Sequence, residues 1–435
     1  MKRYYSTRDV EHKAFYSLKE AAFMGLAPDG GLFMPESIPE VDLAEVQRLA
    51  SISYADMAIY LASLFFGEDV SPEDLETMVR RAYDFDCPLV GLSSGIDVLE
   101  LFHGPTYAFK DFGARFMGGM LGLLNKSDDA LTVLTATSGD TGSAVAAGFH
   151  NVPGVRVIVL YPRGQVSPLQ EAQMTTLGGN ITPVSVNGCF DDCQALVKAV
   201  FNDREFRKTH NVTSANSINV LRWIPQSFYY FYAWAQWVAK GGKGSPDIVV
   251  PSGNYGNITA GMLAARMGLP VRRFVCGANA NDVIPEFLST GVYRPRPSVR
   301  TVANAMDVGA PSNYERLMCL YDFDYQKVIS ALQGFAYTDE QIREAIREIY
   351  GKYSYVSDPH AAVAYMAYRD SKAEGFYLAT AHPAKFPDVI SDAFRNTSVD
   401  SGKAVKMPEG LAKAMKKEKS FIQMENDLDT LEALI

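Results

Sequence analysis

Residues 131–142 read LTVLTATSGDTG, an apolar run that leads directly into a glycine-rich turn. A second stretch of the same kind, IVVPSGNYGN, occupies residues 248–257. Each turn is predicted to join a buried strand to a helix, one beginning near Ser143 and the other near Ile258. Backbone amides converge at such a junction and the helix dipole favours an anion there. The two stretches therefore predict an α/β fold with two candidate anion-binding turns.

Neither turn has the sequence of a nucleotide-binding motif. The Walker pattern needs a Gly-Lys-Ser/Thr ending and the dinucleotide pattern needs Gly-x-Gly-x-x-Gly. A single glycine turn between a strand and a helix is often only a tight connection. Two such turns in one chain, both rich in hydroxyl and amide side chains, favour binding over connection alone.

Short apolar runs alternate with helical segments from residue 131 onward, the pattern of parallel sheets covered by helices. The predicted strands are residues 131–134, 155–160, 181–186, 248–250, 271–276 and 376–378. Helix starts are predicted at Ser167-Pro168 with Gln170, at Thr338 with Gln341 and at Asp358-Pro359. Residues 1–95 lack this alternation and contain predicted helices over 43–66 and 72–83.

Composition excludes several classes of protein. The chain has 435 residues, of which 47% are hydrophobic and 21% charged, as in ordinary soluble proteins with two or three packed units. A net charge of -9 predicts no general affinity for nucleic acid or anionic membranes. Five scattered cysteines predict neither a disulfide framework nor a metal site, although Cys189 and Cys193 could be imagined as ligands. The charged N-terminus predicts a cytoplasmic protein without a signal peptide.

Lys110 is the candidate nucleophile, within HGPTYAFKDFG at residues 103–113. Phe109 and Phe112 flank it, and apolar surroundings reduce a lysine's preference for the charged form, as an imine-forming amine requires. A surface lysine lying over an aromatic patch would give the same local sequence. The residues alone leave these two interpretations equal.

Several stretches together resemble one enzyme family. They are FHGPTYAFKDFGARF (102–116), LTATSGDTG (134–142), LYPRGQVSPLQ (160–170), TSANSINVLR (213–222), VPSGNYGN (250–257) and LATAHPAKFPD (378–388). YYSTRD, GLAPDGGLFMP, NAMDVGAPSN and SDPHAAVAY extend the similarity over nearly the whole chain. These motifs resemble the bacterial and fungal threonine synthases, which are fold type II pyridoxal-phosphate enzymes.

The resemblance implies two open α/β domains with the cofactor, pyridoxal 5'-phosphate, between them. The expected boundaries are 1–95 for an N-terminal helical domain, 96–128 and 216–405 for the large domain, and 129–215 for the small domain. Residues 406–435, basic and then acidic, are expected to form a solvated helical tail. In open α/β sheets, ligands lie at the carboxyl ends of strands, where both glycine turns fall.

The resemblance also implies roles for particular residues. Lys110 is the expected Schiff-base lysine, and Asp140 is expected near the phenolic oxygen of the cofactor. Related enzymes often carry asparagine at the position of Asp140. The expected cofactor-phosphate cup consists of Ser252, Gly253, Asn254, Tyr255, Gly256 and Asn257. The expected substrate-carboxylate loop contains Thr137, Ser138 and Thr141. The expected ligands of a substrate phosphate are Arg163, Ser167, Asn216, Asn219 and Arg222, with His103 as a further possibility.

Thr380 follows the predicted strand 376–378 and is expected to face the cofactor cleft. The resemblance implies that its hydroxyl meets the pyridine nitrogen of the cofactor. The alternative is that Thr380 caps the helix after Pro383, a common role for threonine.

The implied reaction is the conversion of O-phospho-L-homoserine and water into L-threonine and phosphate, catalysed by a monomer or homodimer. The enzyme would be a carbon–oxygen lyase acting on a phosphate. A related phospho-lyase, a serine or threonine dehydratase, or a cysteine synthase would share the lysine and the glycine turns. A catalytically inactive protein of the same fold would be expected to lose them.

Overall fold

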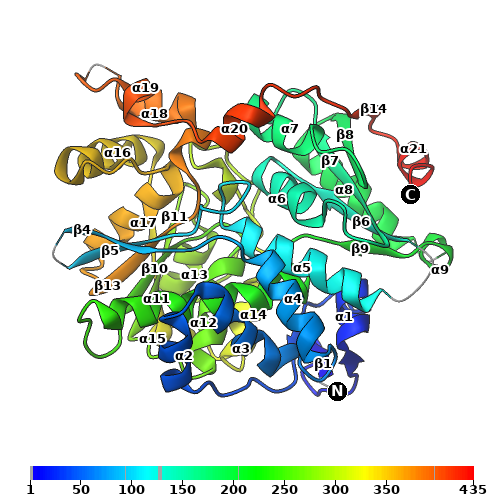
Figure 1. Cartoon of the computed structure of the whole chain (residues 1–435), viewed down its shortest axis with the longest axis horizontal. Coiled ribbons are helices and arrows are strands. Elements are labelled where there is room, and N and C mark those ends of the chain that lie inside the picture. Colours follow the sequence, from blue (N-terminus) through cyan, green and yellow to red (C-terminus); the bar gives the residue numbers. More distant parts are fainter. Residues whose placement is uncertain (1–2, 94, 126–129, 204, 396) are drawn as a thin grey trace.

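The structure is a computed structural model that describes residues 3–93, 95–125, 130–203, 205–395 and 397–435. Two helix-covered sheets lie beside each other, and the N-terminal helices pack below both of them in the view of Figure 1. The predicted α/β class is therefore confirmed. The exact domain boundaries stay a prediction, and the junction expected between residues 128 and 129 falls outside the described residues.

The first sheet contains the first glycine turn. Its five strands have the order β14-β8-β7-β6-β9, and all neighbours are parallel. They are β6 (Leu131–Ala136), β7 (Val155–Pro162), β8 (Ile181–Asn187), β9 (Val212–Ser214) and β14 (Ile422–Glu425). Its helices are α6 (Asp140–Phe149), α7 (Pro168–Thr175), α8 (Phe190–Asn202) and the short α9 (Phe206–Thr209). The three strands predicted here are confirmed.

The second sheet contains the second glycine turn. Its six strands have the order β12-β11-β10-β13-β5-β4, and only β4 is antiparallel to its neighbour. They are β4 (Leu89–Ser93), β5 (Ile96–Glu100), β10 (Asp247–Pro251), β11 (Arg273–Ala278), β12 (Leu332–Ala336) and β13 (Gly375–Ala379). The predicted strands 248–250, 271–276 and 376–378 are confirmed, the second of them beginning two residues later, at Arg273.

The central strands of this sheet are buried on both faces. Ile248 and Val250 of β10 belong to one hydrophobic core, whereas Val249 belongs to the other. Successive side chains of a strand point to opposite faces, so a strand covered on both sides reads as a continuous apolar run. Helices α11 (Phe228–Ala239) and α12 (Gly256–Arg266) supply side chains to the first core, and α16 (Asp339–Tyr353) and α17 (Pro359–Asp370) supply the second.

The three predicted helix starts are also confirmed. Ser167 caps α7 and Asp358 caps α17, each followed by proline in the first turn. Thr338 and Gln341 form a reciprocal capping box at α16. The remaining helical elements of the two domains are α5 (Lys110–Leu124), α10 (Val220–Trp223), η1 (Ile224–Ser227), α13 (Val283–Thr290), η2 (Asn304–Met306), α14 (Tyr314–Leu320), α15 (Tyr325–Ala331), η3 (Pro383–Lys385), α18 (Pro387–Ala393) and α19 (Ser401–Ala404).

The N-terminal unit contains strands as well as helices. A three-stranded antiparallel sheet is formed by β1 (Arg3–Ser6), β2 (Tyr16–Ser17) and β3 (Phe33–Pro35). The helices are α1 (Leu18–Met24), α2 (Leu43–Ala50), α3 (Tyr54–Phe66) and α4 (Pro72–Ala82). The helix predicted over 43–66 is thus broken, because Ser53 caps a new helix.

The C-terminal tail corrects another expectation. It forms α20 (Glu409–Ala414), then β14, then α21 (Leu428–Glu432), so the prediction of a wholly helical solvated tail is wrong. β14 extends the first sheet beside β8, and the side chains of Met424 and Leu431 are buried in the core of that sheet. Within the described residues, no helix is long and apolar enough to cross a membrane.

Candidate active site

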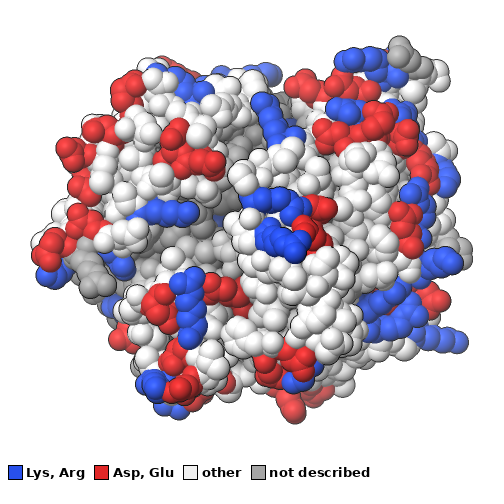
Figure 2. Space-filling view, turned by 180° about the vertical axis from the view of Figure 1, so that it is seen from behind, with Lys and Arg blue, Asp and Glu red and all other residues white. Residues whose placement is uncertain are grey.

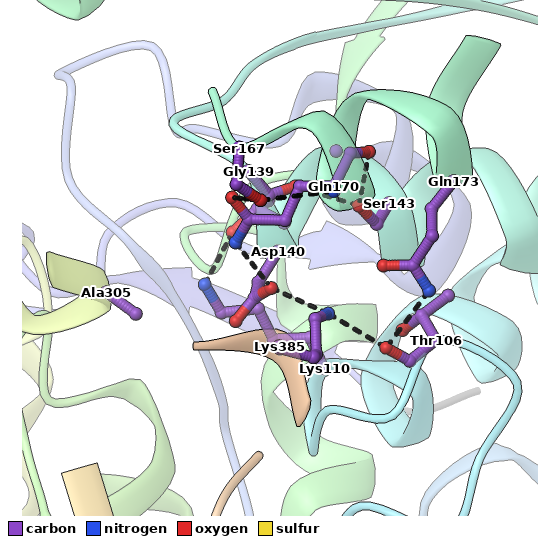
Figure 3. A network of polar contacts seen from close by, with 12 residues as sticks. Thr106, Lys110, Gly139, Asp140, Ser143, Ser167, Gln170, Gln173, Ala305 and Lys385 are labelled. Atoms are coloured by element: carbon purple, nitrogen blue, oxygen red, sulfur yellow. Dashed lines mark hydrogen bonds and ion pairs between the residues drawn. The ribbon is translucent and has the colours of Figure 1, made fainter. Parts of the chain in front are cut away.

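Three segments, two of which follow strands of different sheets, come together around Lys110. The turn after β6 carries Asp140 and Thr141, and α5 begins at Lys110 itself. The segment after β13 runs through Thr380 to Lys385, and Figure 3 shows Lys385 lying close to Asp140 and Lys110. Both the β6 and the β13 segments follow the carboxyl ends of parallel strands, as expected for a ligand site in such sheets.

The Lys110 amine is held at a fixed place. Its Nζ donates a hydrogen bond to Thr141 Oγ1 at 2.9 Å. Burial lowers the pKa of Lys110 to about 8, although the negative charge of Asp140 opposes this change. The segment before it is tied to the β13 segment by a hydrogen bond from Phe109 N to Thr380 O at 2.8 Å. A buried lysine with a lowered pKa favours the imine-forming interpretation over the surface one.

Asp140 is a buried carboxylate with two side-chain partners. Its Oδ1 lies 2.7 Å from Lys385 Nζ and accepts a hydrogen bond from Gln170 Nε2 at 2.9 Å (Figure 3). Burial by itself would raise the pKa of Asp140, but the charges of Lys385 and Lys110 outweigh it and the pKa is lowered. Asp140 therefore faces Lys110 as an anion.

Lys385 was not singled out from the sequence. Its side chain is fully buried, and its Nζ also donates to Thr106 O at 2.8 Å. The sequence feature that could have indicated Lys385 is its position five residues after Thr380, in the motif LATAHPAKFPD. A lysine in a loop is usually exposed, so burial of this one follows only from the packing of the two sheets.

The turn at residues 137–142 is stabilised by hydrogen bonds among its own residues. Thr137 Oγ1 accepts hydrogen bonds from the amides of Gly139 and Gly142, at 2.9 and 2.8 Å. Gly139 has a φ of 147°, and an added Cβ would lie 2.4 Å from the Gln170 side chain. Ser138 is exposed at the tip of the turn. Thr137 is thus engaged in forming the turn, whereas Thr141 contacts the Lys110 amine and Ser138 makes no contact of this kind.

The turn at residues 252–257 leaves a helix end uncapped. Tyr255 precedes α12 with a left-handed φ of 60°, and no side chain caps the first amides of the helix. Asn254 is held by Ser217 Oγ at 2.6 Å and by the amide of Ser312 at 2.7 Å. Uncapped amides at a helix start form an anion site. This turn therefore suits the phosphate of a ligand.

Two further positions in this turn are constrained. A Cβ on Gly253 would lie 2.5 Å from Met306 Cα, so only glycine fits there. A Cβ on Gly256 would lie 3.3 Å from Asn313 Nδ2, a tight but less severe contact. The Oγ of Ser252 donates to Val250 O at 3.1 Å. Asn257 Oδ1 accepts from Tyr229 and Tyr230, and its buried Nδ2 has no hydrogen-bond partner within the described residues.

Thr380 lies immediately beyond the end of β13 and is 6% exposed. The short helix η3 after it is capped by His382, whose Nδ1 accepts from Ala384 N at 3.1 Å. The interpretation of Thr380 as the cap of that helix is therefore wrong. Its hydroxyl makes no hydrogen bond to any described residue, so it is available to a ligand.

The candidate substrate-phosphate ligands differ in how they are placed. The exposed Arg163 follows β7, and its Nη2 donates to Met424 O of the tail at 3.3 Å. Ser167 caps α7, and Asn216 accepts from Thr135 Oγ1 at 2.7 Å. The buried Asn219 donates to Ala22 O and Ser214 O and caps α10. These contacts give Ser167 and Asn219 structural roles in the unliganded chain.

Arg222 is buried close to Lys110. Its Nη1 donates to Ala215 O at 2.5 Å, and its buried Nε has no partner among the described residues. Burial lowers the pKa of Arg222 to about 10, so it stays charged at neutral pH. The positive charge of Arg222 contributes to the lowered pKa of Lys110. Of the two candidate arginines, Arg222 is the one whose charge influences the Lys110 amine.

Other candidates are less involved. His103 is partly exposed and pairs with Glu100 Oε2 at 2.7 Å. All five cysteines are free. Within the described residues, no cluster of His, Cys, Asp or Glu could hold a metal ion.

Comparison with known proteins identifies the family. A model described as "Pyridoxal-phosphate dependent enzyme" matches residues 70–376, well over half of the chain. "Threonine synthase N terminus" matches residues 3–83 and "Threonine synthase, C-terminal" matches residues 360–435. The chain belongs to the threonine synthase family.

Relatives agree along the whole chain. The threonine synthase of Escherichia coli is 44% identical over 386 residues, covering 87% of this chain and 89% of that protein. The yeast threonine synthase from Saccharomyces cerevisiae is 37% identical, covering 97% and 95%. A crystal structure of pyridoxal-phosphate-bound threonine synthase from Brucella melitensis is 34% identical with a TM-score of 0.91, covering 100% of this chain and 98% of that one. The chain is therefore a fold type II pyridoxal-phosphate-dependent lyase of amino-acid biosynthesis.

The residues present fit pyridoxal phosphate. Lys110 supplies a primary amine whose pKa of about 8 leaves part of it neutral near neutral pH. The uncapped start of α12 supplies amides for the phosphate, and the buried Asn257 Nδ2 has no partner among the described residues. Thr380, 6% exposed, supplies a hydroxyl. The structure thus brings together Lys110, Thr141, Asp140, Arg222 and Lys385.

Proposed function

We propose that this chain converts O-phospho-L-homoserine and water into L-threonine and phosphate, with Lys110 as the cofactor lysine and proton carrier. The observation that carries the proposal is the partly neutral Lys110 amine, bonded to Thr141 and facing the ionised Asp140. The family supports the reaction, and the match to the N-terminal family segment favours it over dehydratases.

Each group in the cleft has a proposed task. When bound, pyridoxal phosphate supplies a conjugated ring that takes up the electron pair released at the substrate Cα. Lys110, freed when the substrate amine replaces it, moves protons at Cα, Cβ and Cγ, because its pKa of about 8 lets it both accept and donate near neutral pH. Ser138 and Thr141, with the turn shaped by Thr137, bind the substrate carboxylate.

The remaining proposed contacts hold the cofactor and the substrate phosphate. Residues 252–257 would bind the cofactor phosphate through backbone amides, and Asp140 would be the carboxylate near its phenolic oxygen. Arg222 binds the substrate phosphate, with Arg163 and Ser167 as further proposed contacts, while Asn219 supports the α10 turn that carries Arg222. The free cysteines suit the reducing cytoplasm that we propose as its location.

A product assay tests the reaction. The purified holoenzyme is incubated with O-phospho-L-homoserine, and threonine, 2-oxobutanoate and phosphate are quantified together. We expect equal amounts of threonine and phosphate. Release of 2-oxobutanoate in place of threonine would instead identify a phospho-lyase of the same fold.

Replacing Arg222 should weaken substrate binding. Charge-assisted hydrogen bonds contribute roughly 1.5 to 3 kcal/mol, so Arg222→Met is expected to raise the KM for phosphohomoserine about tenfold to a hundredfold. Arg163→Met should change KM less, because Arg163 is exposed and bonded to the tail. Unchanged absorption by the bound cofactor and unchanged thermal unfolding would show that both variants are intact. If neither variant changed KM, the phosphate site would lie elsewhere.

Replacing Thr380 should change the electronics of the bound ring. A carboxylate keeps a pyridine nitrogen protonated, whereas a hydroxyl is a neutral partner. Thr380→Asp is therefore expected to shift the visible absorption of the bound cofactor and to raise abortive products relative to threonine. Thr380→Ser keeps the hydroxyl and should change little. An unchanged spectrum and product ratio in Thr380→Asp would contradict the placement of this hydroxyl at the ring nitrogen.

A further inference from the structure

Lys385 forms a buried ion pair across the two sheets. It closes η3, which follows the second sheet, and its Nζ lies 2.7 Å from Asp140 Oδ1 on α6 of the first sheet. Neither side chain is more than 4% exposed. Its second contact is the carbonyl of Thr106, in the segment that leads to Lys110 (Figure 3). A buried charge persists only when it is paired and hydrogen-bonded, so each partner of this pair depends on the other.

Two cations and one carboxylate act on the reacting amine of Lys110. Asp140 on α6 attracts the proton of Lys110, while Arg222 on α10 and Lys385 on η3 repel it. Thr141 adds only a neutral hydroxyl. Burial is the largest cause of the lowered pKa of Lys110, and the negative charge of Asp140 is the main opposing influence. Whether the Lys110 amine keeps its proton therefore depends on how far the negative charge of Asp140 is compensated by another cation.

The other titratable groups near Lys385 make no direct ion pair with Asp140. Asp111 on α5 is hydrogen-bonded to the hydroxyl and amide of Thr106, at 2.6 and 2.8 Å. Burial raises the pKa of Asp111 to about 6. His382, on the same segment as Lys385, has its pKa lowered by burial and caps η3 through Nδ1. Lys385 is thus the cation bonded directly to Asp140.

We propose that Lys385 is a positioning residue of the catalytic centre, which compensates the charge of Asp140 so that the Lys110 amine is released from its proton for imine formation and proton transfer. This inference rests on the proposed role of Lys110. It assigns to Lys385 an electrostatic task that a purely structural link between the two sheets would not perform.

The proposal predicts that two substitutions shift the pKa of Lys110 in opposite directions. Lys385→Met leaves Asp140 with Lys110 as its counter-ion, so Lys110 holds its proton to a higher pH. Asp140→Asn removes the attraction, so Lys110 loses its proton at a lower pH. The double variant replaces an ion pair by a neutral pair and should return close to the wild-type midpoint. We expect single-variant shifts of about one pH unit or more.

The measurement uses the full chain after removal of the cofactor. Lys110 is methylated with formaldehyde and a borohydride reductant between pH 6 and pH 10, and its modification rate is followed by mass spectrometry of the peptide. In the wild type the rate should rise through a midpoint near pH 8, because only the neutral amine reacts. In the holoenzyme, the pH dependence of the cofactor absorption should move in the same directions. This second readout does not depend on turnover.

Matched variants separate the proposal from a loss of folding. Lys403→Met removes an 87% exposed lysine and should leave the midpoint unchanged. Adding Lys385→Met to Asp140→Asn must raise the midpoint again, and this comparison holds even if Lys385→Met alone does not fold. Single-variant shifts in the same direction, or no upward shift in the double variant, would make Lys385 a structural brace only. Loss of threonine formation in Asp140→Asn with no midpoint shift would leave the role of Lys110 standing but overturn that of Lys385.

Discussion

Lys110→Ala is expected to bind pyridoxal phosphate weakly and to lose threonine formation by orders of magnitude. The substitution removes the primary amine that is bonded to Thr141 and can form an imine, and it removes the proposed carrier of protons at Cα, Cβ and Cγ. General acid–base catalysis by itself contributes about 10²- to 10⁴-fold. Single-turnover formation of threonine from phosphohomoserine, measured beside the wild type, gives the size of the loss.

Two controls show that the missing amine is responsible for the loss. Lys110→Arg keeps a positive charge and a long side chain, but a guanidinium neither forms the imine nor gives up its proton, so this variant should be as inactive as Lys110→Ala. A small primary amine such as ethylamine, added to Lys110→Ala, should restore part of the activity. Near wild-type turnover in Lys110→Ala would overturn the assignment of Lys110.

Local sequence patterns were sufficient for the strands and turns that build the cleft. The runs at residues 131–134 and 248–250 are buried throughout, and all of their residues except Thr132 are apolar, so the signal is strong. β14 was missed because an edge strand buries few side chains, and only Met424 of its four residues is buried. The charge run before it indicated a solvated helix, which is wrong for residues 422–425.

The polar residues of the site were harder to assign. The resemblance indicated Asp140, and the structure adds its partner Lys385. Lys385 was missed because an ion pair between segments about 245 residues apart leaves no local pattern in the sequence. Thr137 and Asn219 were expected to contact the substrate, yet their hydrogen bonds hold their own turns. Hydroxyl and amide side chains near a helix start serve as caps and ligands alike, so composition alone does not separate these roles.

Gly253→Ala is expected to abolish tight binding of pyridoxal phosphate. The added Cβ would lie 2.5 Å from Met306 Cα and 3.0 Å from its carbonyl oxygen, and these are backbone atoms that cannot rotate away. The turn must therefore open, which moves the uncapped amides of α12 away from the phosphate that they are proposed to bind.

Gly256→Ala is the matched control, since its Cβ would meet only side chains, at 3.3 Å from Asn313 Nδ2 and 3.5 Å from Ser217 Cβ. Cofactor titration followed by absorbance should give a much larger rise in Kd for Gly253→Ala than for Gly256→Ala. Because the proposed binding residues of phosphohomoserine lie outside this turn, its KM in cofactor-saturated Gly253→Ala should stay close to the wild-type value. An unchanged cofactor Kd in Gly253→Ala would place the phosphate cup at another turn.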